Sequence, residues 1–524
     1  MKRLIYLFLI LTCLFISGCD EPDTPTPDDE KYYAVSFDTG INYIIETKNV
    51  KEGSLLEEPT DVLIREGYLF KGWTTINNDY TSLYDFSTPV TSDFTLYAYY
   101  EKDHFDYSVY LDEYVPSIIG EDLEWPTQIG DAHLIWDTSD YTLLSTTGKV
   151  YPARTKKEVT VMLEVYNNGD RYYYSKDVTI KALELKELES GNLTVGYYSS
   201  WNFFGYTDET LETLDIVNLC FAYVDSNNGL ILRELYAVMN QVLEAHKKGV
   251  RVLLSVQGYG SDGTNFSLAA KTKESREKLA QNMLEVCEKY HFDGIDIDWE
   301  YPGFNTGTST AIDRANYTLL MQEIYETLKA KDPTYLLTAA IPGGPYLTSR
   351  FDLANVHKYL DFINIMTYDL QSSGRATHHT ALYPSSATIS GCSVDESVKS
   401  YLNQGVPAEK IVIGIAFYGK YTVSSSLGGS GSSYKSITYT KILSDYLNNP
   451  NASYYNGFDE IANAPYILDY TNGYFITYDN ELSVERKCQY VLNNKLGGVM
   501  VWEIGEDMSG NLVSVINKTM KMEK

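Results

Sequence analysis

Three acidic side chains alternate with apolar ones in residues 292–302, and their type and spacing are those of groups that transfer protons. Side chains of a β-strand point alternately to its two faces, so Asp296, Asp298 and Glu300 share one face at intervals of roughly 6.6 Å. Burial and like-charge repulsion raise the proton affinity of at least one of these carboxyls. An acid that is protonated near neutral pH is what a glycosidic oxygen needs in order to leave.

Other interpretations of this stretch fit its pattern less well. A calcium loop places oxygen donors on consecutive turns around a central glycine, not on a strand that alternates with apolar residues. Three buried carboxylates with only a structural role would be costly to keep inside a protein. The sequence therefore favours a catalytic acid.

The elements that must position these acids are strands that alternate with amphipathic helices from residue 193 onward. Helical runs such as 233–246 and 275–290 separate the strands. The pattern predicts a (β/α)8 TIM barrel, in which chemistry lies at the C-terminal ends of the strands. The expected strands are 195–198, 216–223, 250–256, 294–299, 336–341, 362–367, 411–417 and 498–502.

Residues 293–300, DGIDIDWE, match the DxxDxDxE motif of family 18 glycoside hydrolases, so this part of the chain resembles the chitinase family. Further phrases of the family follow in order. They are Gly196-Tyr197-Tyr198, Met366-Thr367-Tyr368-Asp369, Gly414-Ile415-Ala416-Phe417-Tyr418-Gly419 and Val499-Met500-Val501-Trp502-Glu503. The resemblance covers about residues 193–520.

The resemblance implies a retaining hydrolysis in which the substrate's own acetamido oxygen attacks the anomeric carbon. Glu300 would be the acid and then the base. Asp298 would bind the acetamido N–H, and Asp296 would be the inner member of the pair of aspartates. Tyr368 would donate to the acetamido oxygen and completes the implied catalytic set. The implied substrate-binding residues are Tyr197, Ser255, Tyr259, Tyr301, Met366, Asp369, Tyr418 and Trp502.

Departures from the family pattern affect three places. Strand three reads Ser255-Val-Gln257-Gly-Tyr259, where chitinases usually show SxGG followed by tryptophan, which puts the leaving-group subsite in doubt. Lys420 stands where many members have arginine. A short α+β insertion is expected at about residues 421–480. His378 and His379, in the loop after strand six, could contact substrate, but adjacent residues on a loop are more often solvated, and we expect that here.

The first residues read as an export signal, with a charged start and an apolar run too short to span a bilayer. The run ends in Ile-Ser-Gly-Cys19, which resembles the bacterial lipoprotein signal, and a plain secretory signal is the alternative. Residues 20–30 are rich in Asp, Pro and Thr and are typical of a tether. We expect a lipid on Cys19 that anchors the protein to a membrane of the bacterial cell envelope, at the cell surface.

Two small all-β domains precede the barrel. Residues 32–102 resemble the internalin-B-type repeat, a β-grasp-like module, through phrases such as Lys71-Gly72-Trp73. Residues 104–186 look like a bacterial immunoglobulin-like sandwich, in which we expect Trp136 in the core rather than on a sugar-binding surface. The predicted organisation is 1–18 signal, 19–31 tether, 32–102 repeat, 104–186 sandwich and 193–522 catalytic barrel.

Composition limits the partners. Acidic side chains outnumber basic ones, 71 to 42, so the surface repels nucleic acid. The cysteines that remain after Cys13 and Cys19 are far apart, without CxxC spacing, so no metal is expected. No organic cofactor is implied, and we expect a monomer.

Three functions fit this sequence. The first is a chitinase that acts on chitin or chito-oligosaccharides. The second is an endo-β-N-acetylglucosaminidase that releases glycans containing N-acetylglucosamine from glycoproteins. The third is a non-catalytic surface lectin of the same fold, but such proteins commonly lose the acid that Glu300 provides.

Overall fold

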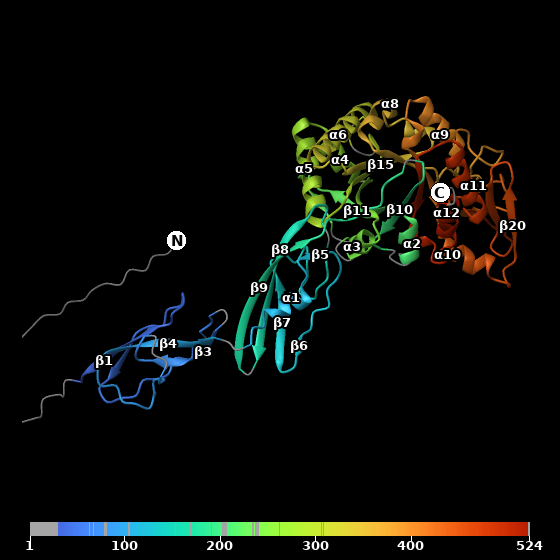
Figure 1. Cartoon of the computed structure of the whole chain (residues 1–524). Coiled ribbons are helices and arrows are strands. Elements are labelled where there is room, and N and C mark those ends of the chain that lie inside the picture. Colours follow the sequence, from blue (N-terminus) through green and yellow to red (C-terminus); the bar gives the residue numbers. More distant parts are fainter. Residues whose placement is uncertain are drawn as a thin grey trace, which may run out of the picture.

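The computed structural model describes residues 30–521, apart from residues 62, 66–67, 78–80, 103–104, 152, 168, 190, 202–206, 233–234, 236–239, 261, 305–306 and 308. The described strands form four sheets (Figure 1). The signal, Cys19 and nearly all of the tether lie outside the described residues. Across the described part of the chain, every helix is too short or too polar to cross a membrane.

The largest sheet closes into a barrel of eight parallel strands, because its first strand pairs with both the second and the eighth. The predicted (β/α)8 barrel is therefore confirmed, with each expected strand in place. A short strand, β12 (Leu230–Ile231), pairs antiparallel at the end of the second. The barrel strands are β10 (Leu193–Ser199), β11 (Ile216–Val224), β13 (Arg251–Tyr259), β14 (Gly294–Glu300), β15 (Leu336–Pro342), β16 (Phe362–Met366), β17 (Ile411–Ala416) and β23 (Gly498–Trp502).

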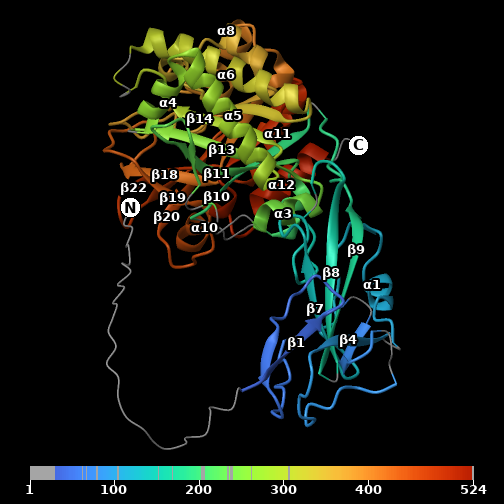
Figure 2. The ribbon, with the colours of Figure 1, turned by 90° about the vertical axis from the view of Figure 1, so that its left-hand side faces the viewer.

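Helices cover the outside of this barrel (Figure 2). The outward face of each strand is apolar and packs against them in one continuous core. Local signals fix where helices begin: Thr272 and Ser275 form a capping box at the start of α5. The principal helices are α2 (Asp208–Thr213), α3 (Asn240–Lys247), α4 (Asp262–Ala270), α5 (Lys273–Tyr290), α6 (Thr310–Lys331), α9 (Val394–Asn403), α11 (Glu481–Asn493) and α12 (Asn511–Lys521). Shorter ones are α7 (Pro345–Thr348) and α8 (Leu353–Val356).

The insertion after the seventh barrel strand is an antiparallel sheet of five strands. A lysine and an aspartate, Lys487 and Asp479, join it to α11 through an ion pair of 2.6 Å, and both side chains are buried. Its elements are β18 (Tyr418–Val423), β19 (Lys435–Thr438), α10 (Tyr439–Ile442), a π-helical turn (Leu443–Leu447), β20 (Tyr454–Asp459), β21 (Ala464–Asp469) and β22 (Tyr474–Thr477).

Two further sheets precede the barrel. The first has the order β2-β1-β4-β3 and buries Trp73. The second has the order β5-β9-β8-β7-β6 and buries Trp136, which stacks on Trp125 at 5.1 Å, so Trp136 belongs to the core as predicted. The strands are β1 (Tyr32–Asp38), β2 (Lys48–Lys51), β3 (Tyr68–Thr74), β4 (Phe94–Lys102), β5 (Ile118–Ile119), β6 (Gln128–Ile129), β7 (Ala132–Thr138), β8 (Lys157–Asn167) and β9 (Asp170–Ile180), with α1 (Val109–Tyr114) after β4.

An arginine links the second of these sheets to the barrel. Arg154 Nη1 lies 2.5 Å from Asp293 Oδ1, and Arg154 Nε lies 3.2 Å from Asp332 Oδ2. Asp293 is fully buried and also accepts hydrogen bonds from the amide of Val252 and faces His246 Nε2 at 2.7 Å. These barrel residues lie before a strand, at its beginning or at the end of a helix, so the contact is made with the N-terminal face of the barrel.

Candidate active site

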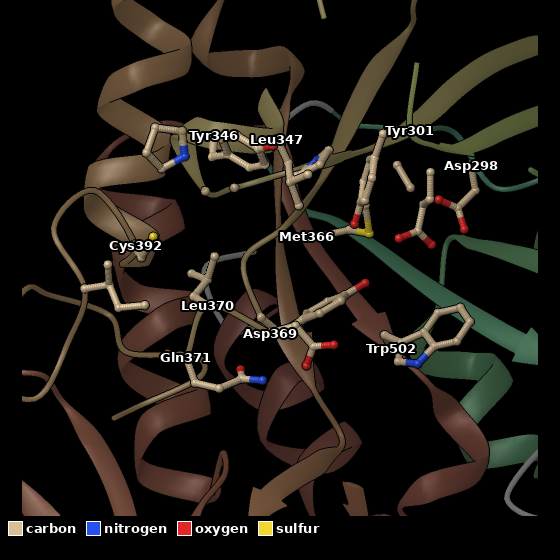
Figure 3. A pocket seen from close by; sticks show the side chains of 18 of the residues that line it. Asp298, Tyr301, Tyr346, Leu347, Met366, Asp369, Leu370, Gln371, Cys392 and Trp502 are labelled. Atoms are coloured by element: carbon tan, nitrogen blue, oxygen red, sulfur yellow. The ribbon is translucent and has the colours of Figure 1, made fainter. Parts of the chain in front are cut away.

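A cavity of about 620 Å³ opens at the C-terminal ends of the barrel strands (Figure 3). Its walls come from the ends of β14, β15, β16 and β23 and from the segments 343–347 and 389–392. Nine of the residues singled out from the sequence line it together: Tyr197, Asp298, Glu300, Tyr301, Met366, Tyr368, Asp369, Tyr418 and Trp502.

Strand β14 carries the acids on its inner face, as its alternation predicted. The residues between them face outward, where Trp299 stacks on Phe266 of α4 at 5.4 Å. The neighbouring β13 has Gly258 against the same ring, and a Cβ atom there would lie 2.3 Å from Phe266. The packing of the outer face therefore fixes the strand that presents the acids.

Asp296 lies below the cavity, fully buried, and four side chains donate hydrogen bonds to it. Each donor belongs to a different barrel strand, so the carboxylate ties β10, β13, β15 and β16 to β14. All of its roughly four acceptor positions are filled. The donors are the Tyr197 hydroxyl (2.8 Å), the Ser255 hydroxyl (2.8 Å), the Thr338 hydroxyl (2.6 Å) and the Asn364 amide (3.3 Å).

Asp298 and Glu300 form an interacting pair at the cavity. Burial raises the pKa of Asp298 well above its usual range, and the charges of Glu300 and Asp296 raise it further. Burial also raises the pKa of Glu300, and Asp369 adds to the effect. Oδ1 of Asp298 is buried and has no hydrogen-bond partner in the described parts of the chain. The pair therefore keeps a proton at a pH where ordinary carboxyls are ionised, and one oxygen is left for a ligand.

Aromatic rings form one side of the site. In Figure 3 the indole of Trp502 lies below Asp298. Phe221 stacks on Trp502 with ring centres 5.7 Å apart, and Tyr197 contacts the same indole at 5.5 Å. Trp201, half exposed, continues the row beyond Phe221 at 5.9 Å. A flat apolar platform of this kind suits the face of a sugar ring.

Asp369 also lines the cavity, in a left-handed backbone conformation (φ 56°). Its carboxylate accepts a hydrogen bond of 2.7 Å from Tyr418 and pairs with Lys420 Nζ at 3.0 Å. Burial pushes the pKa of Asp369 up, but His379, Lys420 and Tyr418 together outweigh it and hold the pKa below its usual range. Lysine at position 420 thus fixes this carboxylate in its ionised form.

The hydroxyl of Tyr368 points into the same site. Its one described hydrogen bond is a weak one of 3.7 Å to the sulfur of Met500. Burial, followed by the charges of Asp298 and Glu300, raises the pKa of Tyr368 well above its usual value, so the group stays a donor. It can therefore give a hydrogen bond to a ligand.

Some expected positions differ from the structure. Ser255 donates a hydrogen bond to Asp296 and does not line the cavity, and Tyr259, with 61% of its surface exposed, does not line it either. The expectation that His378 and His379 are solvated is wrong, because both are fully buried. His378 packs near Phe475 of the insertion, whose sheet covers this loop.

Several lining residues had not been identified from the sequence. Gln257 had been noted only because it departs from the family's SxGG pattern. Tyr346 and the segment 389–392 had not been considered. Phe221 could have been found at the end of the second strand, where barrel residues face the site. Among the described residues, no group of three His, Cys, Asp or Glu side chains is placed to hold a metal ion.

Comparisons with known proteins agree with this geometry. Endochitinase 1 of Metarhizium robertsii is 28% identical over 357 residues, which cover 61% of this chain and 82% of the relative. The solved N-acetylglucosaminidase of family 18 from Paenibacillus barengoltzii is 32% identical, with a TM-score of 0.56 over 63% of this chain and 99% of that one. The chitinase ChiW of Paenibacillus sp. strain FPU-7 is 28% identical, with a TM-score of 0.56 over 71% of this chain and 48% of that one.

Two family models match the chain. Residues 33–99 match the Listeria-Bacteroides repeat domain. Residues 193–507, which include all the acids of β14 and the platform of β23, match the glycosyl hydrolases of family 18. With the barrel, the acid strand and this match in agreement, the chain belongs to glycosyl hydrolase family 18.

Proposed function

We propose that this chain hydrolyses β-1,4-linked N-acetylglucosamine chains, as chitin or chito-oligosaccharides, with retention of configuration. The observation that carries the proposal is the arrangement on β14. Asp296 is fully hydrogen-bonded, Asp298 keeps one free buried oxygen, and Glu300 reaches the cavity with a raised pKa. An endo-β-N-acetylglucosaminidase or a lectin is favoured less, because Endochitinase 1 and ChiW, to which the chain is similar, are chitinases and because the acid is present.

The reaction begins with proton donation from Glu300 to the glycosidic oxygen. As the C–O bond breaks, the acetamido oxygen of the same sugar attacks the anomeric carbon, so the protein needs no nucleophile of its own. The free oxygen of Asp298 accepts the acetamido N–H and stabilises the positive charge that develops. Tyr368 donates to the acetamido oxygen and orients it for attack.

In the second step Glu300, now ionised, takes a proton from water. That water attacks the anomeric carbon from the side that the leaving group vacated, and the cyclic intermediate opens with retained configuration. Trp502 supports the sugar from below, and Asp369, held ionised by Lys420, binds a hydroxyl group of the distorted ring. The hydroxyl of Tyr418 keeps Asp369 in position.

We also propose that the mature protein begins at Cys19, carries lipid there and displays its barrel at the bacterial cell surface as a monomer. The lipoprotein-like end of the export signal supports this. ChiW, a similar protein, is described as cell-surface-expressed and multi-modular. The internalin-type and immunoglobulin-like modules would act as spacers between membrane and barrel.

Mass spectrometry of products tests the activity. The chain from Asp20 onward is incubated with chito-oligosaccharides and, separately, with a high-mannose glycoprotein. Short N-acetylglucosamine oligomers from the first substrate support the proposal, and single sugars would indicate action from chain ends. Glu300→Gln should abolish them, while Glu326→Gln, a change of the same type on α6, should not. Release of intact glycans from the glycoprotein, or no product from either substrate, contradicts it.

The anchor is tested separately. Metabolic labelling with a palmitate analogue should mark the full chain, and Cys19→Ala should remove the label and release the protein from the membrane fraction. A labelled Cys19→Ala protein would contradict the anchor.

A further inference from the structure

Strand β13 faces β14 residue for residue, with Ser255 opposite Asp296, Gln257 opposite Asp298 and Tyr259 opposite Glu300. Paired residues on parallel strands point to the same face, so each acid has a β13 side chain beside it. The Ser255 hydroxyl already binds Asp296 at 2.8 Å. Gln257 and Asp298 line the same cavity, and the Gln257 amide lowers the pKa of the Asp298 carboxyl.

Asp298 cannot rely on Asp296 for its orientation. The four donors around Asp296 fill its acceptor positions, and no hydrogen bond joins the two aspartates within the described part of the chain. One oxygen of Asp298 has no hydrogen-bond partner among the residues that the structure describes, although only 4% of the residue is exposed. The amide of Gln257 is therefore the group that can fix which way this carboxylate points.

We propose that Gln257 is a positioning residue, whose amide holds one oxygen of Asp298 so that the other faces the acetamido N–H of the substrate. This inference rests on the proposed function. Glycine in place of Gln257 would leave Asp298 free to turn, whereas Gly258 next to it cannot carry a side chain because Phe266 fills that space. Gln257 acts on the reaction through Asp298 and forms no bond to the reacting atoms.

The Gln257 amide also affects the pH at which Asp298 becomes ionised. Asp298 stabilises the developing positive charge only as a carboxylate, and burial with neighbouring charges raises its pKa, whereas the Gln257 amide lowers it. Without the amide, Asp298 takes up a proton at a higher pH, and activity is lost earlier on acidification. The titratable groups that interact with Asp298 are Asp296 and Glu300 of its own strand, and Tyr197, Cys220, Tyr301, Tyr317 and Tyr368.

The test uses Gln257→Met, which keeps the length of the side chain without the amide, in the chain from Asp20 onward. The pH profile of kcat/KM on a soluble chito-oligosaccharide should have its acid limb displaced upward by roughly one to two pH units, the equivalent of one hydrogen bond to a charged group. We expect kcat to fall about tenfold and KM to change less. Gln489→Met, on the exposed face of α11, is the matched control and should match the wild type.

A second variant, Gln257→Glu, and a crystal structure of Gln257→Met test the inference independently of the kinetics. Gln257→Glu has the same shape but places a third charge beside the pair, so its acid limb should move further upward. A crystal structure of Gln257→Met should show Asp298 turned away from its original position. An unchanged acid limb in a folded Gln257→Met protein, or an unmoved Asp298, overturns the inference while leaving the proposed function intact. A wild-type protein that releases no product overturns both.

Discussion

Removing Arg154 tests whether the sheet β5–β9 and the barrel form one stable unit. The residue comes from the segment before β8, and its side chain is only 12% exposed. It pairs with Asp293, which is fully buried at the foot of the acid strand β14. Its guanidinium also lies over the ring of Tyr335, 4.4 Å from the centre. Arg154→Met removes the charge and keeps most of the apolar length.

The expected loss of stability in Arg154→Met depends on the contacts that Asp293 retains in the variant. Breaking a buried ion pair by removing one partner costs about 3–5 kcal/mol, because an uncompensated charge remains. Here His246 and the amide of Val252 still face the carboxylate, and Arg154 is partly open to water. We therefore expect a smaller loss, about 2–3 kcal/mol in the free energy of unfolding.

The effect should depend on pH. Burial pushes the pKa of Asp293 up, but His246, Arg154 and Val252 together lower it below the usual value. A lowered folded pKa means that this stabilisation is fully present above the unfolded pKa, about 3.9, and is lost as pH falls through the folded value. The difference between wild type and Arg154→Met should therefore be full at pH 7 and shrink below about pH 4.

Urea unfolding and hydrogen exchange of the β14 amides measure this difference. Arg171→Met is the matched control, since Arg171 pairs with Glu164 at 3.2 Å but is 55% exposed, and it should cost less than about 1 kcal/mol. A double-mutant cycle with Asp293→Asn isolates the pair. The reasoning is refuted if Arg154→Met is as stable as Arg171→Met at pH 7.

Three further predictions concern the barrel and its chemistry. Gly258→Ala forces a Cβ atom to within 2.3 Å of Phe266, so it should destabilise the protein by about 1–3 kcal/mol in urea unfolding, and an unchanged midpoint would contradict this packing. Lys487→Met leaves Asp479 buried without its cation, so thermal unfolding should reveal a loss of about 3–5 kcal/mol, and a stable variant would show that water replaces the lysine. Because the pKa of Glu300 is raised, kcat/KM should fall with rising pH only above 4.5, the ordinary value for glutamate, and a fall at or below 4.5 would show that Glu300 is not the acid.

The barrel and its acid strand could be predicted because both depend on periodic patterns. Asp296, Asp298 and Glu300 alternate with apolar residues, and this alternation is enough to place them on one face of β14. The same rule could not supply all the donors around Asp296. Thr338 and Asn364 bind it from β15 and β16, and only the closed barrel brings those strands next to β14.

Loops were predicted less well, because their sequences carry no periodicity. His378 and His379 were expected in solvent, yet the insertion sheet folds over them, a contact between residues about a hundred positions apart. The side chain of Gln257 was visible as a departure from the family pattern, but its partner could be identified only from the register of β13 and β14. The immunoglobulin-like and internalin-type assignments and the lipid on Cys19 stay predictions.

The contact through Arg154 has a geometric consequence for the proposed anchor. The sheet next to Arg154 joins the barrel at the ends where its strands begin, whereas the cavity opens where they end. Figure 1 shows this sheet between the N-terminal sheet and the barrel. An anchor at the N-terminus, as proposed, would therefore leave the cavity at the end of the barrel farthest from the membrane. A polymer approaching from the surroundings would then reach the cavity before it met the membrane, so the attachment of the barrel would help to determine which glycans it can bind.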